Sequence, residues 1–409
     1  MTKLRDQLVA NNNTVNWYPK FVGEGRFGNW LENVKDWAVS RTRYWGTPLN
    51  VWRCECGHTD SVGSRAELAE KAIENIDPAT VELHRPYVDD IHITCSECGK
   101  PMTRVKEVID CWFDSGAMPF AQHHYPFENK EKFERLFPAD YICEGIDQTR
   151  GWFYSLLAIS TFVMGKAPYK NVLVNDLVLD KNGKKMSKSK GNVVSPDDLV
   201  RDYGCDSLRM YELFVGPPEL DAEWDDRGID GVYRFLNKVW NLVMDSKDKN
   251  VSATKEMIKI RNKMVYDITT RLESFSLNTV ISGFMEYNNK LNEIAKKAGG
   301  VDKETLSTLA VLLAPFAPHM AEELWQQLGH EGTVFNAGWP TYDEEAMKDD
   351  EVEIAVQING KTRAVVTLAA DVSKEDAIAK GKEAVADKLT GTIVKEIYVP
   401  GRIINIVQK

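Results

Sequence analysis

The chain has 409 residues, of which 43% are hydrophobic and 27% charged, and its formal net charge is −10 at pH 7. This length exceeds one ordinary core and predicts two to four globular domains. The acidic balance excludes a simple nucleic-acid coat protein, although a local basic surface could still bind a polyanion.

Residues 1–215 mix short apolar strands with helices and contain most of the motifs. Neither a membrane-length apolar run nor a secretory signal is seen, so we expect a cytoplasmic protein that does not contact membranes.

Two close cysteine pairs, Cys54 with Cys56 and Cys95 with Cys98, lie in this first region. In a chain without an export signal such pairs indicate metal ligands before disulfides. Four thiolates can close a tetrahedral Zn²⁺ site. Because the first pair is separated by only one residue, one sulfur could be displaced and His58 could replace it. A degraded ribbon with free thiols is the alternative.

A parallel α/β unit is predicted further along the chain. The segment after Asp147 has apolar residues at helical spacing, and Val172–Leu179 reads as a buried strand. A strand, a helix and a strand in this order favour a parallel sheet.

A lysine-rich loop follows that strand, with the sequence Lys185, Met186, Ser187, Lys188, Ser189. It precedes a helix whose predicted start is Ser195-Pro196, an N-cap residue followed by proline. A lysine on such a loop can reach the triphosphate of ATP. Its charge would stabilise the pyrophosphate as it departs, chiefly in the transition state.

Residues 216–345 are predicted to form an α-helical bundle. Tyr233, Leu236, Val239, Trp240 and Val243 recur at helical spacing and should line one buried face.

The last region, 350–409, is predicted to be a small α+β module. An alternating strand leads into Asn359-Gly360, a strong hairpin turn signal, and a second strand follows. A helix over 373–389 and two further strands, 393–399 and 403–407, complete the module.

Several segments of the first region resemble class I aminoacyl-tRNA synthetases, and isoleucyl-tRNA synthetases in particular. They are the loop Lys185–Ser189, Arg41–Gly46 (RTRYWG), Asp110–Gly116 (DCWFDSG) and Cys143–Phe153 (CEGIDQTRGWF). The C-terminal part is more similar to leucyl-tRNA synthetases, in Gly216–Trp224, Tyr233–Trp240, Ala314–Trp325 and Val356–Arg363. Together these segments indicate the isoleucine/leucine/valine group.

The resemblance implies an α/β fold in which 1–215 are the second half of a Rossmann-like catalytic domain. A zinc-ribbon-like insertion is expected at about 50–105. Residues 216–345 would bind tRNA as a helical domain, and 350–409 would contact tRNA. The implied activity is ATP-dependent ligation of isoleucine to its tRNA, with leucine as the alternative substrate.

The resemblance also implies roles for individual residues. The loop would bind ATP, supplied with Mg²⁺, and Lys185 and Lys188 would be catalytic. Asp147 would hold the substrate ammonium as a charge-assisted pair. The other implied amino-acid and adenylate contacts are Trp112, Glu144, Gly145, Gln148 and Trp152.

The H-x-G-H element with which class I synthetases bind ATP is not formed by any of the seven histidines, and the family's editing domain has no counterpart. We therefore expect an N-terminally truncated or split enzyme that needs an N-terminal synthetase half, with an exposed sheet edge where that half would pack. A non-catalytic tRNA-binding paralogue or fragment is the alternative.

Overall fold

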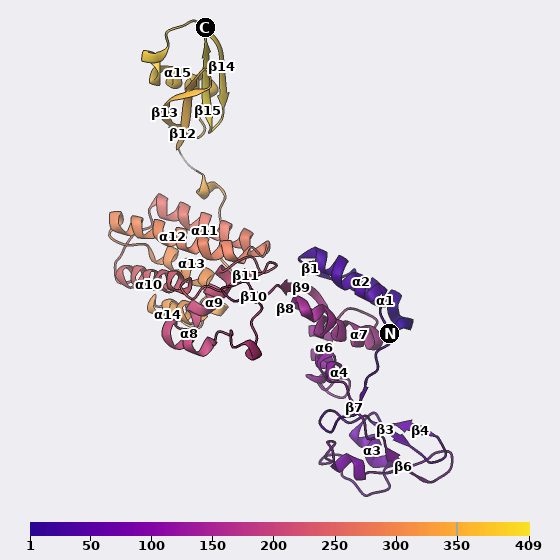
Figure 1. Ribbon diagram of the computed structural model, residues 1–409. Helices are drawn as coiled ribbons and strands as arrows, with labels where there is room; N and C mark the ends of the chain where they lie inside the picture. The colour runs from indigo at the N-terminus through magenta and orange to yellow at the C-terminus, as the bar shows by residue number, and fades with distance from the viewer. Residues whose placement is uncertain (349–350) are drawn as a thin grey trace. The chain divides into compact units, whose positions relative to one another are not determined.

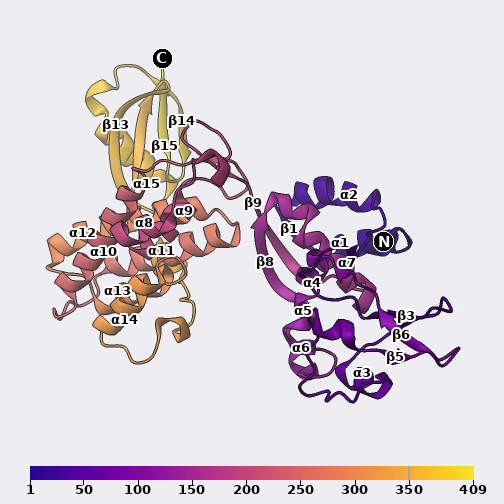
Figure 2. The ribbon, with the colours of Figure 1, turned by 60° about the horizontal axis from the view of Figure 1, so that its bottom comes forward.

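The computed structural model describes residues 1–348 and 351–409, which form two compact units. The first unit comprises 1–193 and 218–224, and the second comprises 194–217 and 225–409 (Figures 1 and 2). Residue 350, the predicted start of the last domain, lies outside the described residues. No helix within the described ranges is both long enough and apolar enough to cross a bilayer.

A three-stranded parallel sheet organises the first unit, in the order β1-β9-β8. The strands are β1 (Asn16–Tyr18), β9 (Tyr169–Asn175) and β8 (Ala139–Gly145). Strand β8 lies at the border of the sheet and pairs with β9 alone among the described strands. The predicted parallel unit is confirmed.

The predicted strand Val172–Leu179 is wrong at both ends. Strand β9 begins three residues earlier and stops at Asn175, where the chain turns away from the sheet. The Asp176 amide then donates to the Pro218 carbonyl oxygen, and the short β10 (Val178–Leu179) pairs with β11 (Ala222–Glu223). The chain therefore leaves the parallel sheet before the lysine-rich loop.

The core beside the sheet is built around Trp17, whose ring lies 5.0 Å from that of Phe27 and 5.6 Å from that of Phe153. Side chains of three helices join it: α1 (Arg5–Asn12), α2 (Gly28–Glu32) and α7 (Trp152–Met164). A second apolar cluster around Phe133 unites α7 with α5 (Met118–Ala121) and α6 (Lys130–Leu136).

A small antiparallel sheet, in the order β4-β3-β6-β5, is inserted between β2 (Ser40–Arg41) and β7 (Val108–Ile109), which pair with each other. Its elements are β3 (Val51–Arg53), β4 (Thr59–Ser61), α3 (Arg65–Lys71), β5 (Ile93–Thr94) and β6 (Pro101–Arg104). It has its own core, which includes Trp52, Leu68 and Ile93. This is the predicted ribbon-like insertion.

Helices dominate the second unit. They are α8 (Pro196–Tyr203), α9 (Cys205–Phe214), α10 (Ile229–Ser246), α11 (Lys255–Glu273), α12 (Leu277–Ala298), α13 (Lys303–Leu313) and α14 (Pro318–Gln327). Helix α8 begins as predicted, with the Ser195 hydroxyl accepting from the Asp197 amide at 3.4 Å. The α-helical bundle is confirmed.

One detail of α10 differs from the sequence prediction. Its buried face follows Val232, Leu236, Val239 and Val243, whereas Tyr233 is 42% exposed. Because successive helical residues are about 100° apart, the position after Val232 falls outside this face.

The C-terminal module is a four-stranded sheet in the order β13-β12-β15-β14. The strands are β12 (Glu351–Ile358), β13 (Lys361–Ala369), β14 (Ile393–Val399) and β15 (Ile403–Gln408), and α15 (Lys374–Ala384) packs against the sheet. The two hairpins are antiparallel, whereas β12 and β15 are parallel. The predicted α+β module is confirmed.

Candidate functional site

One of the predicted site segments, Cys143–Phe153, lies at the carboxyl edge of the parallel sheet. Strand β8 ends with Glu144 and Gly145, and Gly145 is the register partner of Asn175 at the end of β9. In open parallel sheets, ligands bind outside these carboxyl ends. The 3₁₀ helix η4 (Ile146–Arg150) with Asp147 follows β8 directly, whereas the lysine-rich loop follows β9 only after β10.

Trp112 reaches this edge from α4 (Cys111–Gly116). The carboxylate of Asp110 caps that helix by accepting from the Trp112 amide at 3.1 Å. The indole N–H of Trp152 donates to the Ser115 carbonyl oxygen at 3.1 Å and ties α4 to the start of α7. The two predicted pocket tryptophans thus sit on two directly connected helices.

Gln148 links the start of α7 to Asp147. Its side-chain oxygen accepts from the Trp152 amide at 2.9 Å, and its amide nitrogen donates to Asp147 Oδ2 at 3.2 Å. Asp147 is exposed to solvent and lies beside Gly145, where an added Cβ would be 2.7 Å from Asp147 Oδ1. These contacts hold the Asp147 carboxylate at the end of β8. Because the side chain is exposed, its oxygens can still accept hydrogen bonds from a cation.

Gly151 completes this group, although the sequence prediction did not select it. A Cβ at this position would lie 2.9 Å from Trp112 Cη2 and 2.7 Å from Gln148 Oε1. The missing side chain therefore allows the Trp112 ring to approach η4. In the sequence, the only signal for Gly151 is that it belongs to the motif segment Cys143–Phe153.

The lysine-rich loop is held at its base by Asn192 and Asp180, which the sequence prediction also missed. The Asn192 amide oxygen accepts from the Ser187 amide, and its nitrogen donates to Asp180 Oδ2, at 2.9 and 2.8 Å. The pKa of Asp180 is lowered by this hydrogen bond from Asn192 and by backbone amides. The side chains of Lys185 and Lys188 remain exposed.

The loop also has internal contacts around its serines and Met186. The hydroxyls of Ser187 and Ser189 lie 3.2 Å apart, and Met186 is partly buried. No hydrogen bond or ion pair between described residues joins the loop directly to Trp112, Glu144 or Asp147. Within the described residues, the loop and these side chains share only the same compact unit.

The site is open to solvent. Trp112 is 42% exposed, and Glu144 and Asp147 are exposed as well. The apolar ring of Trp112 offers a surface for an aliphatic side chain.

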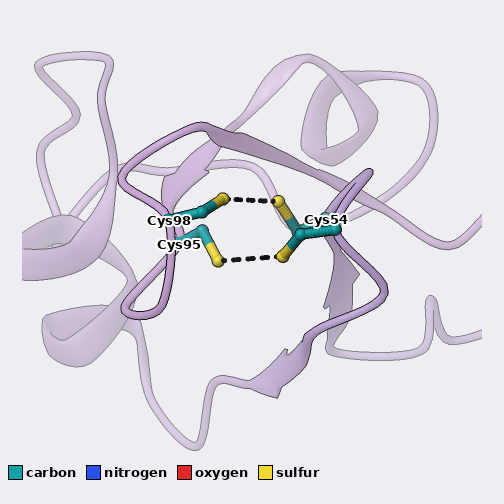
Figure 3. A group of neighbouring side chains, drawn as sticks. Cys54, Cys95 and Cys98 are labelled. Carbon is teal, nitrogen blue, oxygen red and sulfur yellow. Dashed lines mark hydrogen bonds between the residues drawn. The ribbon is translucent and has the colours of Figure 1, made fainter.

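The four predicted metal ligands come together in the ribbon-like insertion. Their sulfurs all lie within 4.8 Å of one another, with Cys54 3.4 Å from Cys98 and Cys56 3.8 Å from Cys95 (Figure 3). A tetrahedron with Zn–S bonds of about 2.3 Å has edges of about 3.8 Å. The cluster could therefore hold a zinc ion.

His58 is not part of this cluster. Its ring nitrogens lie 3.2 Å from the Ser96 hydroxyl and 3.3 Å from the Glu97 carboxylate. His58 therefore does not replace a cysteine sulfur. Although only one residue separates Cys54 from Cys56, the Cys56 sulfur still joins the cluster.

Known families match most of the chain. Residues 1–225 match the family described as tRNA synthetases class I (I, L, M and V), and residues 254–378 match the anticodon-binding domain of tRNA ligase.

Relatives from two clostridia carry the name isoleucine–tRNA ligase. The protein of Clostridium acetobutylicum is 43% identical over 401 residues, covering 88% of this chain, and that of Clostridium tetani is 41% identical over 391 residues, covering 86%. The chain spans only 39% and 38% of these relatives' lengths.

Solved structures show the same fold. A LeuRS of Agrobacterium radiobacter K84, in a ternary complex with tRNA and LeuAMS, has a TM-score of 0.69 at 27% identity, covering 92% of this chain and 51% of its own. Mycobacterium tuberculosis methionyl-tRNA synthetase with methionyl-adenylate has a TM-score of 0.55 at 15% identity, covering 79% and 60%. With the family match over more than half of its residues, the chain belongs to the class I aminoacyl-tRNA synthetases of the isoleucine, leucine, methionine and valine group.

Proposed function

We propose that this chain activates isoleucine with ATP and transfers it to its tRNA as part of a class I synthetase. The observation that carries this is the carboxyl end of strand β8, which leads into the acidic segment, within the same compact unit as the lysine-rich loop. The name of the clostridial relatives favours isoleucine. Leucine remains the alternative substrate, because the LeuRS structure aligns with nearly the whole chain.

The amino acid would bind between α4 and η4. The carboxylate of Asp147 accepts from the substrate ammonium, and Gln148 holds that carboxylate in place. Trp112 and Trp152 provide apolar contact for the branched side chain, and Glu144 with Gly145 borders the adenylate.

Activation joins a carboxylate oxygen of the amino acid to the α-phosphorus of ATP. The bond from that phosphorus to the bridging oxygen breaks, and pyrophosphate leaves with the electron pair. Lys185 and Lys188 would neutralise the charge that grows on pyrophosphate, with Met186, Ser187 and Ser189 shaping the loop around the triphosphate. ATP would arrive with Mg²⁺.

The tRNA would be bound by the helical domain, residues 216–345, and by the module 350–409. The match of 254–378 to an anticodon-binding domain supports the first assignment. An N-terminal synthetase half, bearing the H-x-G-H element, would complete the ATP site, on the same polypeptide or on a separate one.

Zinc would occupy the cluster of Cys54, Cys56, Cys95 and Cys98, since four close sulfurs favour a tetrathiolate site. The zinc would be structural: it would hold the two cysteine-bearing turns of the ribbon-like insertion together and would take no part in the reaction.

The proposal is tested by ATP–pyrophosphate exchange with isoleucine, leucine and valine. The chain is assayed alone and mixed with the N-terminal half of a related enzyme. We expect isoleucine-dependent exchange in the mixture. Retained tRNA binding without exchange in any mixture would instead favour the non-catalytic tRNA-binding paralogue.

Replacing Lys188 with alanine should lower the exchange rate by about 10²–10³-fold, because a transition-state charge contact is lost. Lys181→Ala is the matched control, since it removes an exposed lysine that precedes the loop motif. Equal rates for the two variants would contradict the role given to Lys188.

A further inference from the structure

Two side chains close the segment that carries the lysine-rich loop into a ring. Asp180 lies before the loop and Asn192 after it, and the Asn192 side-chain nitrogen donates to Asp180 Oδ2 at 2.8 Å. Five lysines and no acidic residue lie between them: Lys181, Lys184, Lys185, Lys188 and Lys190. Because like charges repel one another, this composition by itself favours an open segment. The closed shape therefore depends on specific contacts.

Asn192 uses both ends of its side-chain amide. The oxygen accepts from the Ser187 amide at 2.9 Å. The nitrogen donates to Asp180 and also to the Lys185 carbonyl oxygen, at 3.3 Å. A single side chain thus holds the backbone of the lysine-bearing motif at two positions and joins it to the residue where the ring begins.

Asp180 organises the other side of the ring. Its Oδ1 accepts from the backbone amides of Asn182 and Lys184 at 2.9 Å each. The resulting turn brings Lys185 back to Leu179, with which it forms an antiparallel β-bridge. Since Oδ2 of the same carboxylate receives the Asn192 amide, the two oxygens of Asp180 join this turn to the end of the ring.

The motif therefore has a fixed backbone and free lysine side chains. Lys185 and Lys188 are exposed, and neither forms an ion pair with a described residue. Charges that are already in place stabilise a transition state without reorganisation at the moment of reaction. A misplacement of about 1 Å can lower a rate about 100-fold. A backbone held before the nucleotide arrives meets this requirement.

We propose that Asp180 and Asn192 form a latch that positions Lys185 and Lys188 for the departure of pyrophosphate. Both act through the backbone that they hold, so they are positioning residues and do not touch the nucleotide. The inference rests on the proposed function and deepens it, because it assigns the active shape of the loop to one hydrogen bond between two side chains.

The direction of this hydrogen bond predicts how substitutions combine. Asp180→Asn keeps an acceptor for the backbone amides but sets an N–H group against the Asn192 N–H group. Asn192→Asp keeps an acceptor for the Ser187 amide but sets two carboxylates against each other. The double variant, Asp180→Asn with Asn192→Asp, restores one donor and one acceptor and loses only the contact with the Lys185 carbonyl. Each single change should open the ring, and the swapped pair should close it again.

Limited trypsin digestion of the full 409-residue chain measures the latch without a catalytic step, because trypsin cuts after lysine. Cleavage after Lys185 and Lys188 should become about tenfold faster in each single variant, the loss expected for a hydrogen bond to a charged group. The swapped pair should return to within about threefold of the wild-type rate. Cleavage outside 176–193, measured in the same digest, verifies the fold of each variant.

Asn182→Asp is the matched control. It makes the same chemical change as Asn192→Asp in the same ring, at an exposed side chain that has no hydrogen-bond partner among the described residues. Its cleavage rate after Lys188 should equal that of the wild type. Wild-type rates in both single variants, or a swapped pair that is cut as fast as the single variants, overturn the latch.

Pyrophosphate exchange in the mixture with an N-terminal half tests the positioning role. Asn192→Asp should lower kcat about tenfold and change the KM for ATP less than about threefold, because the lysine contacts are made chiefly in the transition state. The swapped pair should recover most of the rate. An unchanged kcat in a variant whose loop is cut rapidly overturns the positioning role. Absence of exchange by the wild type would refute the proposed function, whereas the digestion would still decide whether the latch exists.

Discussion

Gly151 determines how closely the Trp112 ring can approach the start of α7. A methyl group there would meet Trp112 at 2.9 Å and the Gln148 amide oxygen at 2.7 Å, well inside van der Waals contact. Both neighbours belong to the proposed amino-acid site, so the glycine acts through them as a positioning residue.

Gly151→Ala should therefore raise the KM for isoleucine about tenfold in the exchange assay while leaving the KM for ATP nearly unchanged. Displacement of the Trp112 ring removes apolar contact worth roughly 1–2 kcal/mol. Gly231→Ala is a suitable control, because an added Cβ at Gly231 meets no atom within 4 Å.

Trp112→Phe tests whether Gly151→Ala raises the KM for isoleucine by crowding the Trp112 ring. Trp112→Phe removes the part of the indole that the new methyl group would meet. The effect of Gly151→Ala should then be smaller in the Trp112→Phe background than in the wild type. Additive effects of the two changes would contradict direct crowding.

Part of this site could be predicted from residues alone. The motif segments identified the acids, the lysines and both tryptophans as candidates. They could not indicate that Gln148 caps α7 or that Asn192 supports the loop, because these contacts depend on where the backbone turns. The space left by Gly151 likewise arises only when two separate helices meet.

At the scale of elements, Asp206 on α9 caps a helix that lies more than a hundred residues later. Its carboxylate is 8% exposed and accepts from the Met320 amide at 2.7 Å and from His319 Nδ1 at 2.8 Å. These contacts satisfy an amide at the start of α14 that has no partner inside its own helix.

Asp206→Ala should destabilise the second unit by about 1–2 kcal/mol, since the partly buried Met320 amide loses its acceptor. Asp206→Asn keeps one oxygen in place and should cost less. Urea unfolding followed by circular dichroism measures both. Equal stability of the alanine variant and the wild type would show that water replaces the carboxylate without loss.

Local signals predicted many of the elements. Ser195-Pro196 starts α8, and Asn359-Gly360 forms the hairpin turn, with φ of 50° and 78°. In contrast, strand β1 is only three residues long and finds its partner β9 about 150 residues away, so no periodic pattern could identify it. The turn at Asp176 depends on Pro218, which also lies far from it in the sequence.

At the scale of the whole molecule, the ribbon-like insertion has its own small core, and its turns are joined at the cysteine cluster. Structural zinc sites contribute on the order of 10 kcal/mol to the folding of such modules. Metal loss should therefore unfold the insertion and leave the helical bundle intact.

We expect about one zinc per chain by elemental analysis. After treatment with a strong chelator, hydrogen exchange should accelerate over residues 51–104, while α10–α14 keep their protection. Cys205→Ser, outside the cluster, should not alter zinc content, whereas Cys98→Ser should. Unchanged exchange over 51–104 after complete zinc removal would refute a structural metal.

Strand β8 is an edge strand of the parallel sheet and has seven residues. On its outer side, its backbone amides and carbonyls pair with no other strand of the described chain. Such a row is a template for intermolecular association. Dilution and added salt should consequently change the particle size in light scattering, so enzymatic measurements on this chain need a defined concentration range.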